Sequence, residues 1–163
     1  MKGMAEHFDE VAASHERDFQ ARLGMAKFYD TVEEALSACA PCHDILVLGC
    51  GTGLEIERIH APAHITAVDL SPGMLAELAK KEFTTGIRVE RVCASLLELD
   101  LGVEAFDVVL SCYTLHHFDP EQKAALYGRI HRCLRPGGVF LLGDVHAHSA
   151  DEQAAHLAEA RRV

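Results

Sequence analysis

The segment ILVLGCGTG at residues 45–53 constrains the fold of this chain more than any other stretch. Its first four residues, Ile45–Leu48, are all apolar, which is typical of a strand buried on both faces. Glycines follow at positions 49, 51 and 53. Glycines at a strand-to-helix turn let the backbone approach a ligand closely and point amides at it. The segment therefore predicts a buried strand that leads into a ligand-binding turn.

Short apolar runs alternate with helical patterns along the rest of the chain. We expect helices over 5–19, 25–39, 54–60, 71–81, 120–134 and 150–161, and strands over 45–48, 65–68, 87–92, 106–110 and 139–143. This alternation predicts an α/β fold with a doubly wound, mostly parallel sheet and helices on both faces. Residues 1–163 form one domain, in which 1–40 are a helical lid and 44–163 the cofactor-binding core.

An acidic residue at the end of the predicted second strand indicates a nucleoside ligand. The run ITAVD ends in Asp69, sixteen residues after Gly53. In a doubly wound sheet this position lies beside the glycine turn, at the crevice where the strand order reverses, and a carboxylate there can accept both hydroxyls of a ribose. The alternative is that Asp69 supports the start of the helix at Ser71.

The glycine spacing distinguishes two kinds of nucleoside ligand. Dinucleotide-binding turns usually read G-x-G-x-x-G/A, with a third small residue that allows close packing around a pyrophosphate. Here the spacing is G-x-G-x-G, and Leu54 stands where that small residue would be. S-adenosylmethionine has no phosphates, so the spacing favours this methyl donor over NAD(P). An NAD(P)-dependent oxidoreductase is the less favoured alternative.

Four segments in fixed order resemble one family: ILVLGCGTG, AVDLSPGML, FDVVLSCYTLHHF and LRPGGVFLLGD, between residues 45 and 144. Together they look like the small-molecule branch of the class I S-adenosylmethionine-dependent methyltransferases, which includes the ubiquinone/menaquinone C-methyltransferases. The resemblance implies methyl transfer from S-adenosyl-L-methionine to a small-molecule acceptor, with S-adenosyl-L-homocysteine as product.

The resemblance also implies which residues hold the donor. The glycine turn would line the methionine moiety, the end of the second strand the ribose, and the end of the third strand the edge of the adenine. The residues so assigned are Gly49, Cys50, Gly51, Gly53, Asp69, Leu70, Ser95, Leu96 and, facing the methionine end and the acceptor, Ser111.

Three departures from the family pattern support a second interpretation. Val47 and Ser95 stand where family members commonly carry acidic residues. The family sheet has seven strands, the last two forming a hairpin, whereas only five are visible here, so strands 6 and 7 are expected to be absent. A noncatalytic S-adenosylmethionine-binding or regulatory domain, or a truncated methyltransferase, is therefore the alternative to a full enzyme. An exposed fifth strand would favour a homodimer.

Methyl transfer from a sulfonium is an in-line displacement, so alignment of the reactants supplies much of the acceleration. A general base is needed only when the acceptor loses a proton. Candidates for that role are Tyr113, His116, His117 and His146, each of which could instead be a wall or capping residue. No metal site is predicted, since a solvated loop is the favoured interpretation of Asp144, His146 and His148.

The first two helices supply candidate lid residues, namely Phe8, His15, Phe19 and Tyr29. The chain carries 25 acidic and 15 basic residues, a net charge of −10 that disfavours nucleic acid as a partner. Its apolar runs are too short to cross a bilayer, and its N-terminus has no apolar signal core. We therefore expect a cytoplasmic protein without membrane partners, whose six cysteines are reduced.

Overall fold

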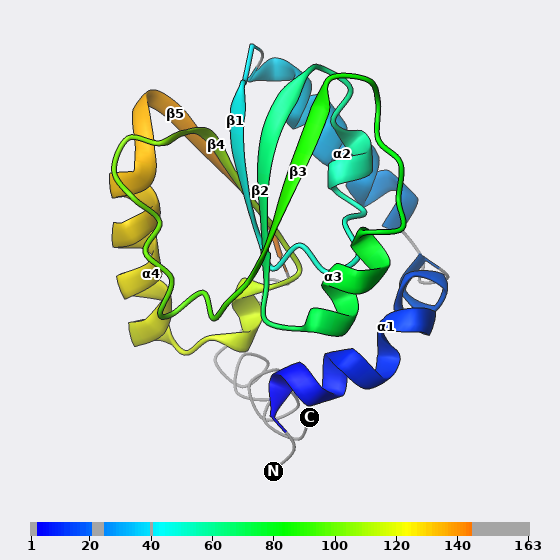
Figure 1. Ribbon diagram of the computed structural model, residues 1–163. Coiled ribbons are helices and arrows are strands. Elements are labelled where there is room, and N and C mark those ends of the chain that lie inside the picture. Colours follow the sequence, from blue (N-terminus) through cyan, green and yellow to red (C-terminus); the bar gives the residue numbers. More distant parts are fainter. Residues whose placement is uncertain (1–2, 21–24, 40, 145–163) are drawn as a thin grey trace.

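The computed structural model describes residues 3–20, 25–39 and 41–144. Its centre is one sheet in which every neighbouring pair of strands is parallel. The strands are β1 (Asp44–Leu48), β2 (Ala63–Asp69), β3 (Ile87–Cys93), β4 (Phe106–Cys112) and β5 (Leu134–Gly143), in the order β3-β2-β1-β4-β5 (Figure 1). The chain winds outward from β1 in both directions, which confirms the predicted doubly wound fold.

Helices cover both faces of this sheet, as the alternation predicted. They are α1 (Met4–Gln20), α2 (Met25–Ala38), α3 (Pro72–Leu78) and α4 (Pro120–Cys133). Figure 1 shows α4 on one face, α2 and α3 on the other, and α1 beside α3 at the end of the sheet. Ser71 caps α3 by accepting a hydrogen bond from the amide of Met74 at 3.0 Å, with Pro72 in the first turn.

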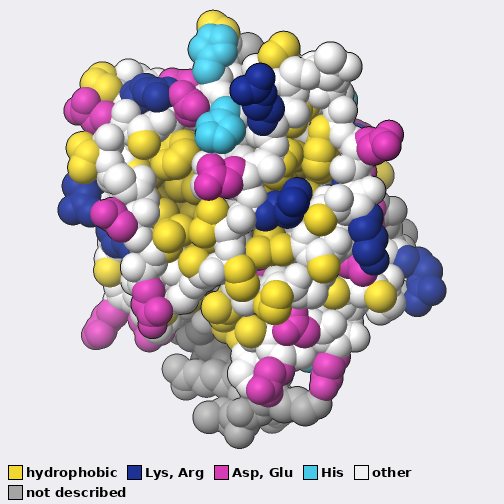
Figure 2. All heavy atoms as spheres, viewed as in Figure 1, with side chains coloured by type: hydrophobic (Ala, Val, Ile, Leu, Met, Phe, Trp, Pro, Cys, Tyr) yellow, Lys and Arg dark blue, Asp and Glu magenta, His cyan; other side chains and the backbone are white. Residues whose placement is uncertain are grey.

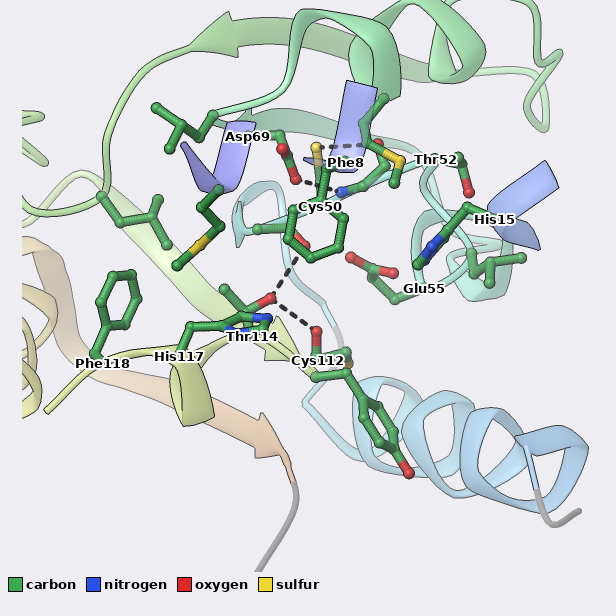
Figure 3. Close-up of a pocket in the computed structure, with 18 of the residues that line it drawn as sticks. Phe8, His15, Cys50, Thr52, Glu55, Asp69, Cys112, Thr114, His117 and Phe118 are labelled. Carbon is green, nitrogen blue, oxygen red and sulfur yellow. Dashed lines mark hydrogen bonds between the residues drawn. The ribbon is translucent and has the colours of Figure 1, made fainter. Parts of the chain in front are cut away.

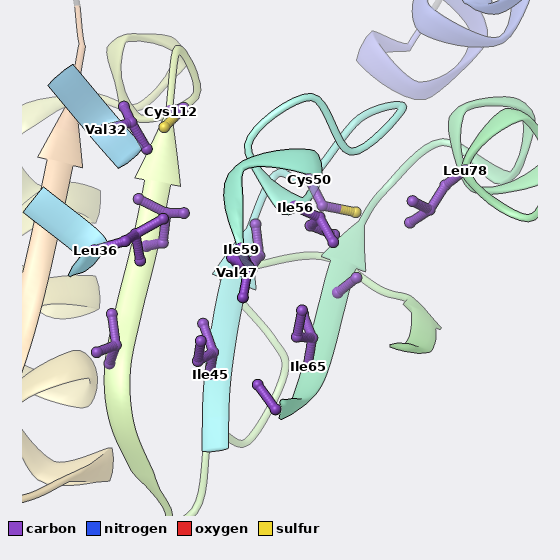
Figure 4. Close-up of a cluster of buried hydrophobic side chains, with 14 of the residues drawn as sticks. Val32, Leu36, Ile45, Val47, Cys50, Ile56, Ile59, Ile65, Leu78 and Cys112 are labelled. Carbon is purple, nitrogen blue, oxygen red and sulfur yellow. The ribbon is translucent and has the colours of Figure 1, made fainter. Parts of the chain in front are cut away.

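Alternate residues of β1 enter two separate apolar cores. Ile45 and Val47 pack with side chains of α2 and α3, a cluster shown in Figure 4. Leu46 and Leu48 pack on the opposite face with side chains of α4. All four are at most 2% exposed, so each contributes about 1.5–3 kcal/mol by burial. The strand is therefore buried on both faces, as its composition predicted.

The connection from β1 to β2 differs from the prediction. The helix expected over 54–60 is a single 3-10 turn, η1 (Ile56–Arg58). The seven residues of β2 span about 23 Å, whereas a helix over residues 54–62 would rise only about 13 Å. Part of the returning chain must therefore be extended, and Ile59 is the first extended residue after the turn.

The last described strand also differs, because β5 begins at Leu134 and not at Val139. Pro136 and Gly137 therefore lie within a strand that was expected to start after them. Within the described residues β5 is an edge strand that pairs only with β4, and an edge tolerates a proline because one side of the strand has no partner. The helix predicted over 150–161 lies outside the described residues.

A carboxylate ties the strands together at their amino ends. Asp107 of β4 accepts hydrogen bonds from the amides of His43 and Asp44, at 2.8 and 3.0 Å. The Arg135 guanidinium donates to Asp107 and pairs with Asp44, both at 2.8 Å. Partial burial opposes ionisation of Asp107, but these hydrogen bonds outweigh it and lower its pKa to about 2.

The face of the molecule seen in Figure 2 is charged, and no basic tract is visible on it. On the face seen in Figure 2, Lys and Arg side chains are dispersed among Asp and Glu side chains. None of the helices in the described part of the chain combines the length and the apolarity that a bilayer span requires.

Candidate functional site

A cavity of about 320 Å³ lies at the carboxyl end of the sheet, where the strand order reverses. The turns that follow β1, β2, β3 and β4 line it, and α1 and α2 supply side chains from above (Figure 3). Ligands of doubly wound sheets bind at this position. The fold therefore creates the crevice that the sequence predicted.

The glycine turn forms one wall of the cavity, but most of its amides are bound within the protein. Those of Gly49 and Cys50 donate to the carbonyl of Val68, at 2.8 and 3.0 Å, and that of Gly53 donates to the carbonyl of Cys50 at 2.7 Å. The amide of Gly51 donates to the Asp69 carboxylate at 2.8 Å. The expectation that these amides point at a ligand is therefore wrong.

Each of the three positions in the turn requires glycine for a different structural reason. A Cβ at Gly49 would lie 2.2 Å from Oγ1 of Thr114, and one at Gly53 would lie 2.4 Å from Cδ1 of Leu78. Both glycines thus allow close packing, and Gly53 does not line the cavity. A Cβ at Gly51 would meet no protein atom within 4 Å, although its φ is +49°. Gly51 therefore leaves open space beside the cavity, where a ligand can approach the backbone.

Asp69 joins the glycine turn to the start of α3. Its Oδ2 accepts from the amide of Gly51 and its Oδ1 from the amide of Ser71, both at 2.8 Å. Burial raises the pKa of Asp69, and these two hydrogen bonds oppose the shift. Each oxygen of a carboxylate can accept a further hydrogen bond, and Asp69 also lines the cavity. Its expected support of the start of α3 is confirmed, and its contact with a ribose stays a prediction.

Apolar side chains line the cavity beyond Asp69. Leu70 is 42% exposed although it is large and apolar, and Leu96 is buried. Ser95 lies in the same loop, where its hydroxyl accepts from the amide of Leu97 at 3.3 Å. Arg129 of α4 holds this loop by donating to the carbonyls of Leu96 and Leu97. The three residues predicted for the adenine therefore form one wall.

The segment after β4 forms the opposite wall. Thr114 donates to the carbonyl of Cys112 at 2.9 Å and lies 3.2 Å from that of Gly49, so it ties this segment to the glycine turn (Figure 3). Tyr113 and His117 line the cavity. Burial lowers the pKa of His117 to about 4, and its Nδ1 has no hydrogen-bond partner within the described residues. His117 is therefore a neutral imidazole at pH 7.

Three other predicted site residues lie elsewhere. Ser111 is fully buried, and its hydroxyl donates to the carbonyl of Leu48 at 3.1 Å, so it does not face the methionine end. His116 is turned to Asp144, with 2.6 Å between its Nδ1 and the carboxylate, and does not line the cavity. His146 lies outside the described residues, as does His148.

Helix α1 contributes to one wall of the cavity, and its role as a lid stays a prediction. Phe8 and His15 line the cavity, together with Tyr29 of α2. The neighbouring Asp9 anchors the helix, because its carboxylate accepts from the hydroxyl of Ser71 at 2.5 Å and from the amide of Gly73 at 2.8 Å. The side chain of Phe19 lies outside the described part of the chain.

Several lining residues were not predicted, and one of them is acidic. They are Met4, Thr52, Leu54, Glu55, Met74, Leu97, Cys112, Thr114, Phe118 and Gln122. The sequence could have indicated Thr114, since it is a polar residue just after a strand at the ligand-binding edge. It indicates Glu55 more weakly, as an acid that stands two residues after the glycine turn between apolar neighbours.

Comparison with known proteins agrees with the fold. A family model described as a methyltransferase domain matches residues 45–138, more than half of the chain. The chain therefore belongs to the methyltransferase domain family.

The chain is similar to the following relatives and solved structures. The carboxy-S-adenosyl-L-methionine synthase of Citrifermentans bemidjiense is 37% identical over 116 residues, which are 66% of this chain and 46% of that protein. An S-adenosylmethionine-dependent methyltransferase from Mesorhizobium loti is 32% identical, with a TM-score of 0.54 over 72% of this chain and 56% of its own. A DhpI–SAM–HEP complex shares the fold, with a TM-score of 0.73 and 23% identity over 95% of this chain and 73% of its own. The chain spans less than half the length of the synthase.

Proposed function

We propose that this domain binds S-adenosylmethionine in the cavity and transfers its methyl group to a small-molecule acceptor. The observation that carries the proposal is the placement of Asp69. Its carboxylate is held by the amides of Gly51 and Ser71 and borders the cavity at the reversal of strand order. A carboxylate so held is oriented to accept the two hydroxyls of a ribose.

The residues that line the walls of the cavity indicate how the donor is oriented within it. An adenine fits against Leu70 and Leu96, because an exposed apolar side chain at a cavity wall offers a surface for a flat ring. The methionine part then extends past the glycine turn toward Cys112 and Thr114. Its methyl group would face the side chains of Phe8, Tyr113 and His117, which form the acceptor end of the cavity.

The residues at the acceptor end of the cavity indicate that the protein promotes methyl transfer by aligning the reactants. His117 is neutral, with a pKa lowered to about 4 by burial, so it is a weak base. His116 is bound to Asp144 and points away from the cavity. Holding nucleophile, methyl and sulfur in line within an apolar enclosure is then the main contribution of the protein. An acceptor that is already a good nucleophile suits this site best.

The charge of the cavity favours the ordinary methyl donor over anionic ligands. Among the described residues that line it, Asp69 and Glu55 are acidic, and none is Lys or Arg. S-adenosylmethionine carries a sulfonium and an ammonium against one carboxylate, whereas NAD(P) and a carboxylated donor carry more negative charge. The cavity thus supports methyl transfer more than carboxy-donor synthesis or hydride transfer. The dispersed cations of the surface likewise support a small acceptor in place of a nucleic acid (Figure 2).

We also infer a cytoplasmic location, for which the six free cysteines are the supporting observation. Dimerisation through the edge of β5 stays a prediction.

Isothermal titration calorimetry tests the proposed function. The wild-type chain should bind S-adenosylmethionine and S-adenosylhomocysteine but not NAD. The D69N variant should bind both about a hundredfold more weakly, because it loses a charge-assisted hydrogen bond to the ribose. D100N is the matched control, since Asp100 is exposed and bonds only locally, to the amide of Gly102. Absence of binding to the wild type at millimolar donor would remove the proposal.

A further inference from the structure

The side chain of Glu55 is a buried acid that the fold itself does not use. It lies between the glycine turn and η1 and is 3% exposed. Its Oε1 has no hydrogen-bond partner within the described residues. Glu55 also lines the cavity, and Figure 3 shows its carboxyl group directed in among the lining side chains.

Lys81 opposes the rise in the pKa of Glu55 only in part, because its ammonium group is paired with two other acids. Lys81 pairs with Glu57 at 2.8 Å and with Glu16 at 3.0 Å. Asp69, the other acid of the cavity, adds a repulsion that further disfavours a charge on Glu55. The backbone amide of Glu55 offsets part of the cost of burying its carboxyl group, but Oε1 keeps no partner among the described residues. A buried polar atom left in this way points to a ligand that bonds to it.

The position of Glu55 within the cavity indicates which part of a ligand it meets. Glu55 contributes to the raised pKa values of Tyr29, Cys50 and Cys112, so it lies near these three residues, all of which line the cavity. With the ribose at Asp69 and the adenine against Leu70, we infer that this part of the cavity receives the amino-acid part of the donor. The amino-acid part of S-adenosylmethionine carries two cationic groups, the sulfonium and the ammonium group.

The structure also shows that the first strand cannot supply this anion. Val47, where the family resemblance implies an acid, is fully buried in the apolar core between the sheet and α2 (Figure 4). We propose that Glu55 binds the ammonium group of the methyl donor. This inference rests on the proposed function, because it assigns one contact within the same donor site.

Glu55 is therefore a binding residue that fixes the direction of the amino-acid part. An ion pair here would hold the methionine chain against the glycine turn and turn the sulfonium toward Tyr113 and His117. No proton transfer to the acceptor is assigned to it.

The pH dependence of binding gives a readout that needs no variant. Burial raises the pKa of Glu55 to about 8, so the free protein holds a proton there that an ammonium ligand must displace. Affinity for S-adenosylhomocysteine should therefore rise between pH 6 and 8, by up to about tenfold per unit. Other charged or titratable groups around Glu55 come from each neighbouring element: His15, Tyr29, Cys50, Glu57, Asp69, Lys81 and Cys112.

The test compares the E55Q and E57Q variants with three ligands. S-adenosylmethionine has ammonium and sulfonium, S-adenosylhomocysteine has only the ammonium, and methylthioadenosine has neither. E55Q should bind the first two about ten- to a hundredfold more weakly and methylthioadenosine unchanged, with no rise in affinity between pH 6 and 8. E57Q, the same change at an exposed neighbour, should keep tight binding of all three ligands and the rise in affinity with pH, although loss of the Glu57 charge lowers the pKa of Glu55.

Each other outcome has a distinct meaning. Unchanged binding of S-adenosylhomocysteine by E55Q would overturn the assignment of Glu55, while the wild-type affinity would still support the proposed function. A loss confined to S-adenosylmethionine would assign Glu55 to the sulfonium and overturn the ammonium contact. A loss for methylthioadenosine as well would show a structural role and overturn the inference. Absence of wild-type binding to all three ligands would overturn the proposed function itself.

Discussion

Replacing Glu55 by glutamine should stabilise the ligand-free protein at pH 8, although most buried substitutions destabilise. Burial raises the pKa of this carboxyl group in the folded protein to about 8 from an ordinary value of 4.5. Between these values the folded protein retains a proton that the unfolded chain releases. Stability is therefore lost as the pH rises from 4.5 to about 8, and glutamine, which does not ionise, removes that loss.

The size of the effect follows from the same two values. A displacement of the pKa from 4.5 to about 8 corresponds to about 5 kcal/mol, because each pH unit is worth about 1.4 kcal/mol. Water that enters the cavity beside Glu55 screens part of this cost, so we expect E55Q to gain about 2–3 kcal/mol at pH 8. For a chain of 163 residues this gain raises the Tm by about 5–10 °C.

Differential scanning calorimetry at pH 5 and pH 8 measures this gain directly. The difference in Tm between E55Q and the wild type should be small at pH 5 and large at pH 8. E57Q should show no such dependence, because Glu57 is exposed and pairs with Lys81. Equal stability of E55Q and the wild type at pH 8 would refute the reasoning, since it would mean that the Glu55 carboxylate is already compensated within the protein.

Two further predictions concern packing and acid stability. G53A should lower the free energy of unfolding by about 2–3 kcal/mol, because its Cβ would lie 2.4 Å from Leu78 at a φ of +82°. G51A should cost only about 1 kcal/mol, since its Cβ meets no protein atom within 4 Å, but should abolish donor binding. Urea titration and calorimetry measure the two effects, and equal losses of stability would contradict the assignment. D107N should destabilise by about 1–2 kcal/mol at pH 7 and match the wild type at pH 2. The pKa of Asp107 is lowered to about 2, so its stabilisation is present above pH 4 and lost as the pH falls toward 2, and acid titration of the circular dichroism signal tests this.

The features that were predictable from sequence are those with a local cause. The glycine turn and Asp69 follow strands whose ends share one edge of the sheet, so residue type and position were enough to bring them together. The caps of α3 and α4 also depend on adjacent residues, as in the capping box formed by Asp119 and Gln122.

The features that were missed depend on tertiary packing. Glu55 was expected on a helix, but the short return to β2 permits one 3-10 turn and places the acid under α2. His116 and His117 are adjacent and chemically identical, and only the position of Asp144 after β5 decides which of them faces the cavity. Ser111 shows the same dependence, because the direction of its side chain follows from strand alternation and the open carbonyl of Leu48.

The placement of the ribose at Asp69 can be examined in a crystal structure of the chain with S-adenosylhomocysteine. We expect both ribose hydroxyls within hydrogen-bonding distance of the Asp69 carboxylate, with the bond from the Gly51 amide retained and the adenine against Leu70. A ligand bound with its ribose away from Asp69, or with its adenine beside Tyr113, would show that Asp69 is not the ribose-binding residue.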